Sequence, residues 1–269
     1  MNSNRTAKTS DRTAKPSRRR ALADTITAIL VLLVFAWALV PGIGPDLLGI
    51  EARTGWRVSA PWQTSAQPIG EDVTTALGKL RVRASQYESN RRYHRTSFGE
   101  VWADEDHNGC DTRDDVLARD MSEVTYKTLT RRCKVASGTL AEPYTGKIIH
   151  FKRGPKTSPL VQIDHVVALG DAWRSGAYAW DAAKRQRYAN DPLVLLATDG
   201  QANQDKGSMA ADQWLPPDHS YHCAYVARQI AIKSKWNLSV TGAEKTTFQR
   251  VLRACPGQHL PQDLGQIHP

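Results

Sequence analysis

Cysteine is scarce in this sequence of 269 residues, which contains only four: Cys110, Cys133, Cys223 and Cys255. No two of them stand at the short spacing of paired zinc ligands, so the sequence disfavours a zinc finger or ribbon. Internal repeats are absent as well, which argues against a repeat architecture. The eight tryptophans are scattered, and none forms, together with basic neighbours, a platform on which nucleic acid bases could stack.

Positive charge is also sparse once the first 20 residues are set aside. The formal net charge is +9, but residues 1–20 contain seven basic residues against Asp11. The rest of the chain therefore carries a net charge of only +3. This balance does not support a basic surface over the whole protein, although it leaves room for a local basic groove.

Long hydrophobic runs are confined to residues 21–40, which follow three consecutive arginines. At about 1.5 Å per residue, a helix of this length just spans a hydrocarbon core of roughly 30 Å. The basic residues before it predict a single membrane span with the bulk of the chain outside the cell. A cleaved signal peptide is the main alternative, because the uninterrupted apolar part, residues 26–40, is short and 36–38 (Ala-Trp-Ala) resembles a weak cleavage site. A buried helix of a soluble domain is the third interpretation of residues 21–40. The first two predict a membrane-anchored or a secreted protein.

The four cysteines all follow the apolar segment. An even number of cysteines in an exported chain predicts two disulfides, for which three connectivities exist. We favour the sequential pairs Cys110–Cys133 and Cys223–Cys255, because each pair brackets a compact block of sequence. A zinc site and free buried thiols are the alternatives.

The pattern of the chain predicts five parts: a basic tail (1–20), the apolar helix (21–40), a linker rich in proline and glycine (41–70), a folded domain (71–256) and a C-terminal tail (257–269). Within the domain, helices are expected at 72–79, 116–121, 181–189, 221–235 and 241–254, the last with a capping box of Thr241 and Glu244. Strands are expected at 147–151, 160–164 and 193–197. This mixture predicts an α+β fold with a small sheet.

The most informative residues are Asp164 and His165, at the end of the apolar run VQIDHVVAL (161–169). A carboxylate and an imidazole at one strand end can hold a divalent cation and activate a water molecule beside it. Asn203, in the later segment DGQANQDKG, can complete the ligand set through its amide oxygen. Such a set of residues is typical of a nuclease.

Several separated blocks then carry a resemblance to a family. They are YHRTSFGEVWADEDHNGCDTRDDVLARD, SGTLAEPYTG, QIDHVVALGDAW, YANDPLVLLATDG, QANQDKG and CAYVARQIAIK. In this order, over roughly residues 71–256, the chain resembles the exported HNH endonuclease family proteins of actinobacteria. The resemblance implies a ββα-metal nuclease core with added helices, disulfides and an N-terminal export segment.

The resemblance also implies roles for single residues. His165 corresponds to the general base, and Asp164 and Asn203 to the metal ligands; these donors suit Mg²⁺ or Mn²⁺ better than Zn²⁺. Lys206 could pair with a phosphate, and Arg113 could clamp one with two hydrogen bonds. Simpler structural roles are open for each: a hydrogen-bonded Asp-His pair, a turn for Asn203, a solvated Lys206, and an ion pair of Arg113 with a neighbouring aspartate.

One position departs from the family pattern. The family usually has an asparagine in the middle of the Asp-Pro-Leu-Asn-Leu-Leu run, where this chain has Val194. That asparagine generally fastens the loop that holds the base, and its loss removes a restraint of about 1–3 kcal/mol when buried. Asn190 lies close by and could replace it. The alternative function is therefore a catalytically weakened module that binds nucleic acid or a cell-envelope partner.

A second cation site is suggested by the opening of a calcium loop. Asp104, Asp106, Asn108 and Gly109 fit the pattern D-x-D-x-N-G, with Asp115 at the twelfth position. An aromatic-rich segment stands where such loops have a helix, so an acidic turn is the alternative interpretation.

Taken together, the sequence predicts a metal-dependent endonuclease that hydrolyses DNA, or RNA, outside the cytoplasm; it leaves the oligomeric state open.

Overall fold

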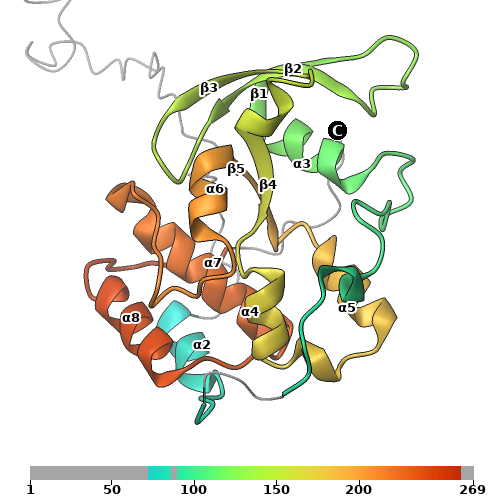
Figure 1. Ribbon diagram of the computed structural model, residues 1–269. Helices are drawn as coiled ribbons and strands as arrows, with labels where there is room; N and C mark the ends of the chain where they lie inside the picture. Colours follow the sequence, from blue (N-terminus) through green and yellow to red (C-terminus); the bar gives the residue numbers. More distant parts are fainter. Residues whose placement is uncertain (1–71, 86–89, 262–269) are drawn as a thin grey trace, which may run out of the picture. The chain divides into compact units, whose positions relative to one another are not determined.

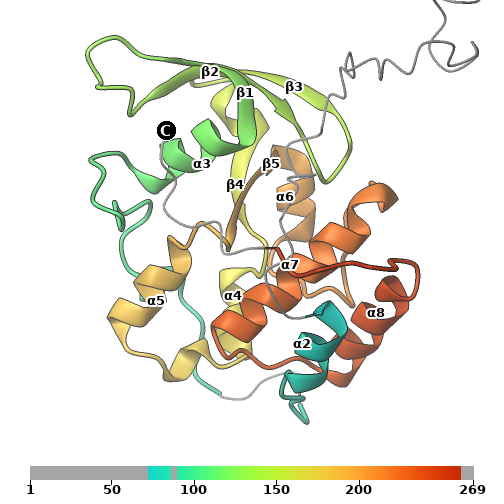
Figure 2. The same ribbon diagram turned by 180° about the vertical axis from the view of Figure 1, so that it is seen from behind.

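The computed structural model describes residues 72–85 and 90–261, which show a mixed α+β fold (Figures 1 and 2). The strands are β1 (Met121–Tyr126), β2 (Val135–Ala141), β3 (Ile148–Lys152), β4 (Val161–His165) and β5 (Leu195–Asp199). The helices are α2 (Val73–Lys79), α3 (Thr112–Asp120), α4 (Leu169–Arg174), α5 (Ala182–Ala189), α6 (Gly200–Lys206), α7 (His222–Lys235) and α8 (Gly242–Leu252), with short 3-10 turns η1 (Arg95–Phe98), η2 (Ser158–Leu160), η3 (Ala177–Ala179) and η4 (His219–Tyr221). The predicted α+β class is confirmed.

Strands β4 and β5 form a two-stranded antiparallel sheet that leads directly into α6. Asp199 ends β5 and also caps α6, because its side chain accepts a hydrogen bond of 2.8 Å from the amide of Ala202. The chain turns between them at Gly200, where an added Cβ would collide with the carbonyl oxygen of Pro159. Only glycine fits there, so Gly200 fixes the junction of strand and helix.

A second sheet, with the strand order β1-β2-β3 and antiparallel pairing throughout, lies beside α3 and covers one end of β4 and β5 (Figure 1). A separate apolar core fills the space between these elements. Its central side chains are fully or almost fully buried and come from α3, both sheets and the strand ends: Val116, Leu117, Leu140, Phe151, Val161, Ile163 and Leu195. This core sets the start of β4, and thereby the position of the strand that carries Asp164 and His165.

The larger core lies among the helices. Helix α7 is its centre and packs against α2 and α8, with α4 and α5 on the other side of the same core (Figure 2). Tyr144, Tyr188, Tyr221 and Tyr225 are buried within it. Lys233 of α7 is also fully buried, and its ammonium lies 2.8 Å from Asp171 and 2.9 Å from Glu244. The ion pairs explain why Glu244 forms only half of the expected capping box: Thr241 accepts from the Glu244 amide, while the Glu244 side chain turns to Lys233.

Both predicted disulfides are confirmed, since Cys110 pairs with Cys133 and Cys223 with Cys255. The first joins the loop before α3 to the β1–β2 turn, and the second joins α7 to the segment after α8.

The predicted basic tail, apolar helix and linker fall on residues 1–70, outside the described residues, as does most of the C-terminal tail. Among the helices of residues 72–85 and 90–261, none is long and apolar enough to cross a membrane.

Candidate active site

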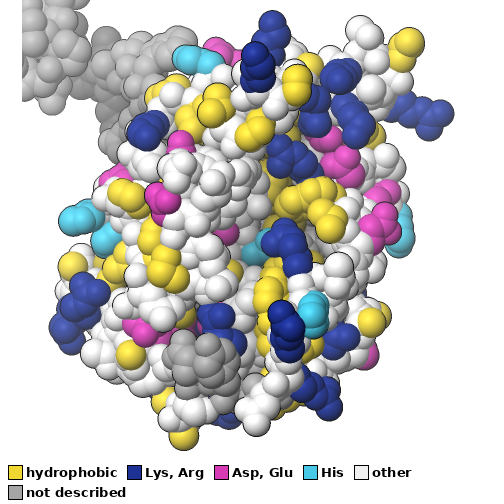
Figure 3. Space-filling model, in the orientation of Figure 1, with side chains coloured by type: hydrophobic (Ala, Val, Ile, Leu, Met, Phe, Trp, Pro, Cys, Tyr) yellow, Lys and Arg dark blue, Asp and Glu magenta, His cyan; other side chains and the backbone are white. Residues whose placement is uncertain are grey.

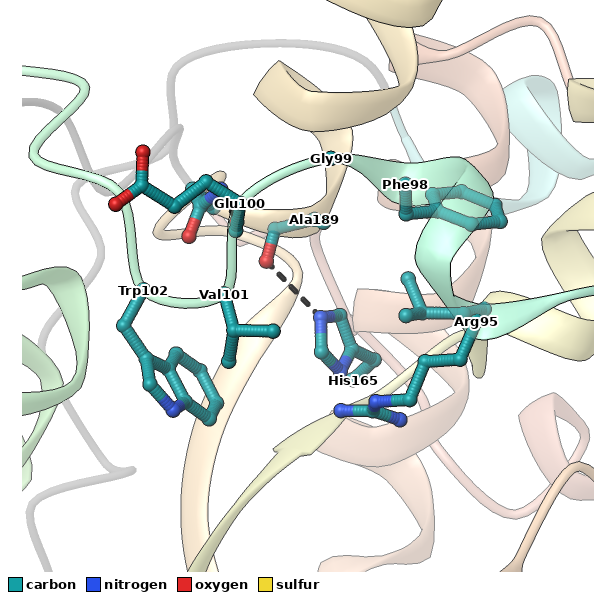
Figure 4. Close-up of a pocket in the computed structure, with 10 residues that line it drawn as sticks. Arg95, Phe98, Gly99, Glu100, Val101, Trp102, His165 and Ala189 are labelled. Atoms are coloured by element: carbon teal, nitrogen blue, oxygen red, sulfur yellow. Dashed lines mark hydrogen bonds between the residues drawn. The ribbon is translucent and has the colours of Figure 1, made fainter.

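A hollow of about 240 Å³ opens beside the end of β4. Its wall is formed in part by Asp164, His165, Asn203 and Arg95, which come from β4, α6 and η1. A smaller pocket adjoins it on the other side of His165 and is lined by Trp102 and the last turn of α5 (Figure 4). His165, Arg95 and the apolar Leu169 line both, so the two polar side chains among them mark the centre of the site.

His165 has a fixed tautomer. Its Nε2 lies 2.9 Å from the carbonyl oxygen of Ala189 (Figure 4). A carbonyl oxygen only accepts hydrogen bonds, so Nε2 carries the proton and Nδ1 is left as the acceptor. Burial lowers the pKa of His165 to about 4; the charge of Asp164 opposes this shift, and the nearby charges of Arg95 and Lys206 add to it. The imidazole is therefore neutral at pH 7, the state that a general base requires.

The ring of His165 is also held by a stacking neighbour. The Trp102 ring lies parallel to it within 20°, with ring centroids 6.2 Å apart. Trp102 has a φ of 62°, a left-handed conformation that is rare for a bulky residue. Its turn is fastened at one end by Asn190, whose side-chain amide donates to the carbonyl of Glu100 at 3.3 Å. Asn190 thus holds the turn that contains Glu100 and Trp102, and it does not fasten the loop that follows His165.

Asp164 and Lys206 form a buried ion pair below the hollow. The Lys206 ammonium is 3.0 Å from Oδ1 of Asp164 and 2.9 Å from the carbonyl oxygen of His165. The other carboxylate oxygen of Asp164 accepts a hydrogen bond of 2.6 Å from the hydroxyl of Tyr144. Because Lys206 has no exposed surface, it does not reach a phosphate in this conformation. The structure places it as the counterion of Asp164, which differs from the phosphate contact that the sequence suggested.

Asn203 lies on the first turns of α6 and faces the same hollow. Its side-chain NH₂ donates to Oε1 of Gln162 at 2.8 Å, which turns the amide so that its oxygen has no protein donor among the described residues. This oxygen and the second lone pairs of the Asp164 carboxylate are hard donors, and they fit an oxygen-preferring divalent cation. Within the described ranges, no group of three or more His, Cys, Asp or Glu side chains could hold a metal.

The loop after His165 is fastened without the usual asparagine. Val194 is completely buried, and its carbonyl accepts a hydrogen bond of 2.8 Å from the amide of Val166. The carbonyl of Val166 accepts from the side chain of Gln229 at 2.9 Å, and that of Val167 from the Tyr188 hydroxyl at 2.6 Å. Side chains from α7 and α5 therefore hold the loop after His165 in this structure.

Arg113 lies away from the hollow. Its guanidinium donates to the carbonyl of Val161 at 3.3 Å, at the opposite end of β4 from His165. The cation beside His165 is instead Arg95, for which the sequence pattern predicted no role. No carboxylate among the described residues pairs with it, and its side chain is exposed. The only signal that could have found it is its place in the YHRTSFG block; no spacing argument links it to His165.

The acidic loop before α3 is held together by its own hydrogen bonds. The Asp104 carboxylate accepts from the amides of Asn108 and Gly109 at 3.1 and 2.9 Å, and the Asn108 side chain donates to Asp106 and Asp115. Burial, followed by the neighbouring aspartates, raises the pKa of Asp115 to about 6. The calcium site at this loop stays a prediction.

These features agree with what the chain is similar to. Residues 111–251 match the family model described as "GmrSD restriction endonucleases, C-terminal domain". The chain belongs to this family. The match extends from the cap of α3 to the penultimate residue of α8, so it includes β4, β5 and α6 with Asp164, His165 and Asn203. Arg95 and Trp102 lie before it.

A second comparison concerns a whole protein. The chain is 39% identical over 149 residues to an "Uncharacterized secreted protein" of Arthroderma benhamiae. The aligned region covers 54% of this chain and 68% of the relative. No solved structure matches this chain. The family model places the protein in a nuclease family, and the secreted relative and the two disulfides both agree with a location outside the cell.

Proposed function

We propose that this protein is an exported endonuclease of the HNH type that hydrolyses phosphodiester bonds in nucleic acid, with DNA as the first candidate substrate. The observation that carries the proposal is the state of His165: a neutral imidazole with Nε2 bound to a carbonyl and Nδ1 left to accept a proton, in the wall of the hollow. The succession of β4, β5 and α6 would then be the ββα core of the nuclease.

In this proposal Nδ1 of His165 removes a proton from the attacking water molecule. Arg95, exposed and without a carboxylate partner in the described chain, holds the phosphate and stabilises the charge that develops on it. Lys206 positions the Asp164 carboxylate. Trp102 and the carbonyl of Ala189 keep the imidazole in one orientation.

Asp164 and Asn203 would hold the divalent cation, Mg²⁺ or Mn²⁺, through oxygen atoms that face the hollow. When bound, such a cation polarises a phosphoryl oxygen and stabilises the leaving group. Lys206 already balances the charge of Asp164, so we expect the protein to bind the cation weakly without substrate, with the phosphate supplying further ligands.

Export is part of the proposal. The relative from Arthroderma benhamiae carries the word "secreted" in its name, and two disulfides require an oxidising compartment. We propose that residues 21–40 direct the chain out of the cell, as a membrane anchor or as a signal that is removed.

The test is cleavage of supercoiled plasmid by the oxidised full chain, with Mg²⁺, with Mn²⁺ or with EDTA. We expect nicking that needs the metal and that is lost in His165→Ala, while the exposed-site control His94→Ala cleaves like the parent. Equal cleavage by a folded His165→Ala variant would refute the role of the base.

A weakened module that only binds nucleic acid or an envelope partner is the second candidate, and Val194 is the observation that favours it. The contacts of Gln229 and Tyr188 with the loop after His165 argue against it. If the folded parent binds plasmid but cleaves it with neither Mg²⁺ nor Mn²⁺, the binding module becomes the favoured function.

A further inference from the structure

The positive charge of the folded part is concentrated in one stretch, from the start of β1 to the turn after β3. Residues 121–157 contain eight basic residues and two acidic ones, a net charge of +6. The chain beyond residue 20 carries only +3, so everything else in it is net negative. Such a separation of charge gives this part of the surface a local positive potential.

Six of the eight basic side chains are exposed and have no carboxylate partner among the described residues; we call them the basic sheet surface. They are Lys127, Arg131, Arg132, Lys147, Lys152 and Lys156. The other two, Lys134 and Arg153, pair with Asp111 and Asp114. Figure 3 shows Lys and Arg side chains gathered over β1–β3 and continuing down the same face.

The acidic residues of the stretch do not offset this charge. Glu142 is fully buried, and its carboxylate accepts hydrogen bonds from the amides of Tyr144 and Thr145. Glu123 is exposed on β1, where it accepts from the hydroxyl of Thr139 at 3.1 Å. Residues 121–157 thus have one exposed carboxylate and six exposed basic side chains without a carboxylate partner.

The β1–β2 turn that carries three of the six is preformed. Cys133 in the turn is bonded to Cys110, and the Thr130 hydroxyl donates to the carbonyl of Lys127 at 2.7 Å. The Arg132 guanidinium lies 5.0 Å from the centre of the Tyr126 ring. Cations on a turn that is already ordered lose little conformational entropy when they bind a partner.

The surface and the hollow are joined by one short strand. Lys156 stands in the turn just before η2 and β4, and His165 is the last residue of β4. With a rise of about 3.3 Å per residue, the five residues of β4 separate its two ends by about 13 Å. One turn of a nucleic acid duplex is about 34 Å long, so a single turn is long enough to extend past both ends of β4.

From this arrangement we propose that the basic sheet surface binds the phosphate backbone of a nucleic acid duplex while one strand of that duplex enters the hollow. The inference rests on the proposed nuclease function and adds the form of the substrate. Single strands are usually held by stacking on exposed aromatic rings. In residues 121–157 Arg132 covers the Tyr126 ring, while Tyr144 and Phe151 are buried. The surface therefore reads phosphates rather than bases, and binding is independent of sequence.

Binding is measured apart from cleavage, by fluorescence anisotropy of a labelled duplex with the oxidised full chain in EDTA, over a range of salt concentrations. The triple variant Arg131→Gln/Lys147→Gln/Lys152→Gln removes three charges of the surface. The variant Arg187→Gln/Arg250→Gln/Arg253→Gln removes three exposed charges elsewhere and is the control. We expect the first to weaken duplex binding by about tenfold or more and to flatten the salt dependence by about two to three units of the log–log slope. We expect the control to do neither.

Equal losses in the two variants, or unchanged duplex binding in the first, would overturn the inference. So would a single strand of the same length that binds as tightly as the duplex. Vesicles of phosphatidylglycerol that bind the parent but not the first variant, with no difference for the duplex, would assign the surface to a membrane.

Hydrolysis of bis(p-nitrophenyl) phosphate with Mn²⁺ separates this inference from the proposed function, since so small a diester needs only the hollow. The first variant should hydrolyse it like the parent, and His165→Ala should not. If the parent hydrolyses neither this diester nor plasmid, the nuclease proposal fails while the anisotropy result still decides the role of the surface.

Discussion

The ammonium of Lys206 lies 3.0 Å from the carboxylate of Asp164, with the two side chains 0% and 4% exposed. A buried charge that loses its partner is strongly destabilising, by about 3–5 kcal/mol. We therefore expect Lys206→Met to lower the free energy of unfolding by that amount, measured by urea denaturation. The exposed control Lys152→Met should change it by less than about 0.5 kcal/mol.

The double variant Asp164→Asn/Lys206→Met distinguishes a lost ion pair from lost packing. It removes both charges, so it should be more stable than Lys206→Met alone. A double variant that is no more stable than the single one would show that Lys206 contributes through its packing.

The pH dependence of activity should reflect the environment of His165. Its pKa in the folded protein is about 4, below the ordinary value of 6.5, because burial disfavours the charged ring. The base therefore stays neutral to well below pH 6, and kcat/KM for plasmid should fall only as the pH approaches about 4. An acid limb centred near pH 6.5, with the circular dichroism unchanged, would contradict this environment.

The same depressed pKa bears on stability. The unfolded chain protonates this histidine near pH 6.5 and the folded one only near pH 4, so the stability that His165 contributes is present above pH 6.5 and declines as the pH falls from about 6.5 to about 4. Substitution by a residue that cannot titrate, as in His165→Phe, should reduce the steepness of acid unfolding in this window.

The loop after His165 offers a test of where its restraint comes from. Gln229→Leu removes the 2.9 Å hydrogen bond to the carbonyl of Val166 and should lower kcat with little change in KM. Val194→Asn places an amide in a fully buried apolar position and should destabilise the fold by about 1–3 kcal/mol without raising activity. A large gain of cleavage in Val194→Asn would mean that the missing asparagine matters after all.

The acidic loop provides a separate test. If Asp104, Asp106, Asn108 and Asp115 bind calcium, added CaCl₂ should raise the melting temperature of the parent. It should not raise that of Asp104→Asn. A melting temperature that is equally insensitive to calcium in both proteins would show the loop to be an acidic turn held by its own hydrogen bonds.

Much of the fold around the site follows from local sequence. The apolar run into Asp164 and His165 predicted β4, and α5 and α7 lie within a residue of their expected limits. β5 lies two residues later than expected, because the chain after Asp191 forms a turn in which the amide of Val194 donates to the carbonyl of Asp191. α3 begins at Thr112, earlier than expected, because Asp111 caps it.

The β1–β2 hairpin was not predicted. Met121–Tyr126 follows α3 without a glycine or proline between them, and the turn has no Asn-Gly pair. Instead, Leu129, Arg131 and Arg132 adopt left-handed φ values of 63°, 49° and 63°, which local propensity disfavours and which the fold around the disulfide sets. The burial of Lys206 could not be predicted either, because its partner Asp164 is 42 positions away.

The bond between Cys110 and Cys133 ties the basic turn to the rest of the fold. It forms only where thiols are oxidised. Without this bond the β1–β2 turn would be less ordered, and binding of a duplex to the basic sheet surface would be weaker. Under the proposed function, the covalent bond that orders the basic turn would therefore link full duplex binding to an oxidising compartment.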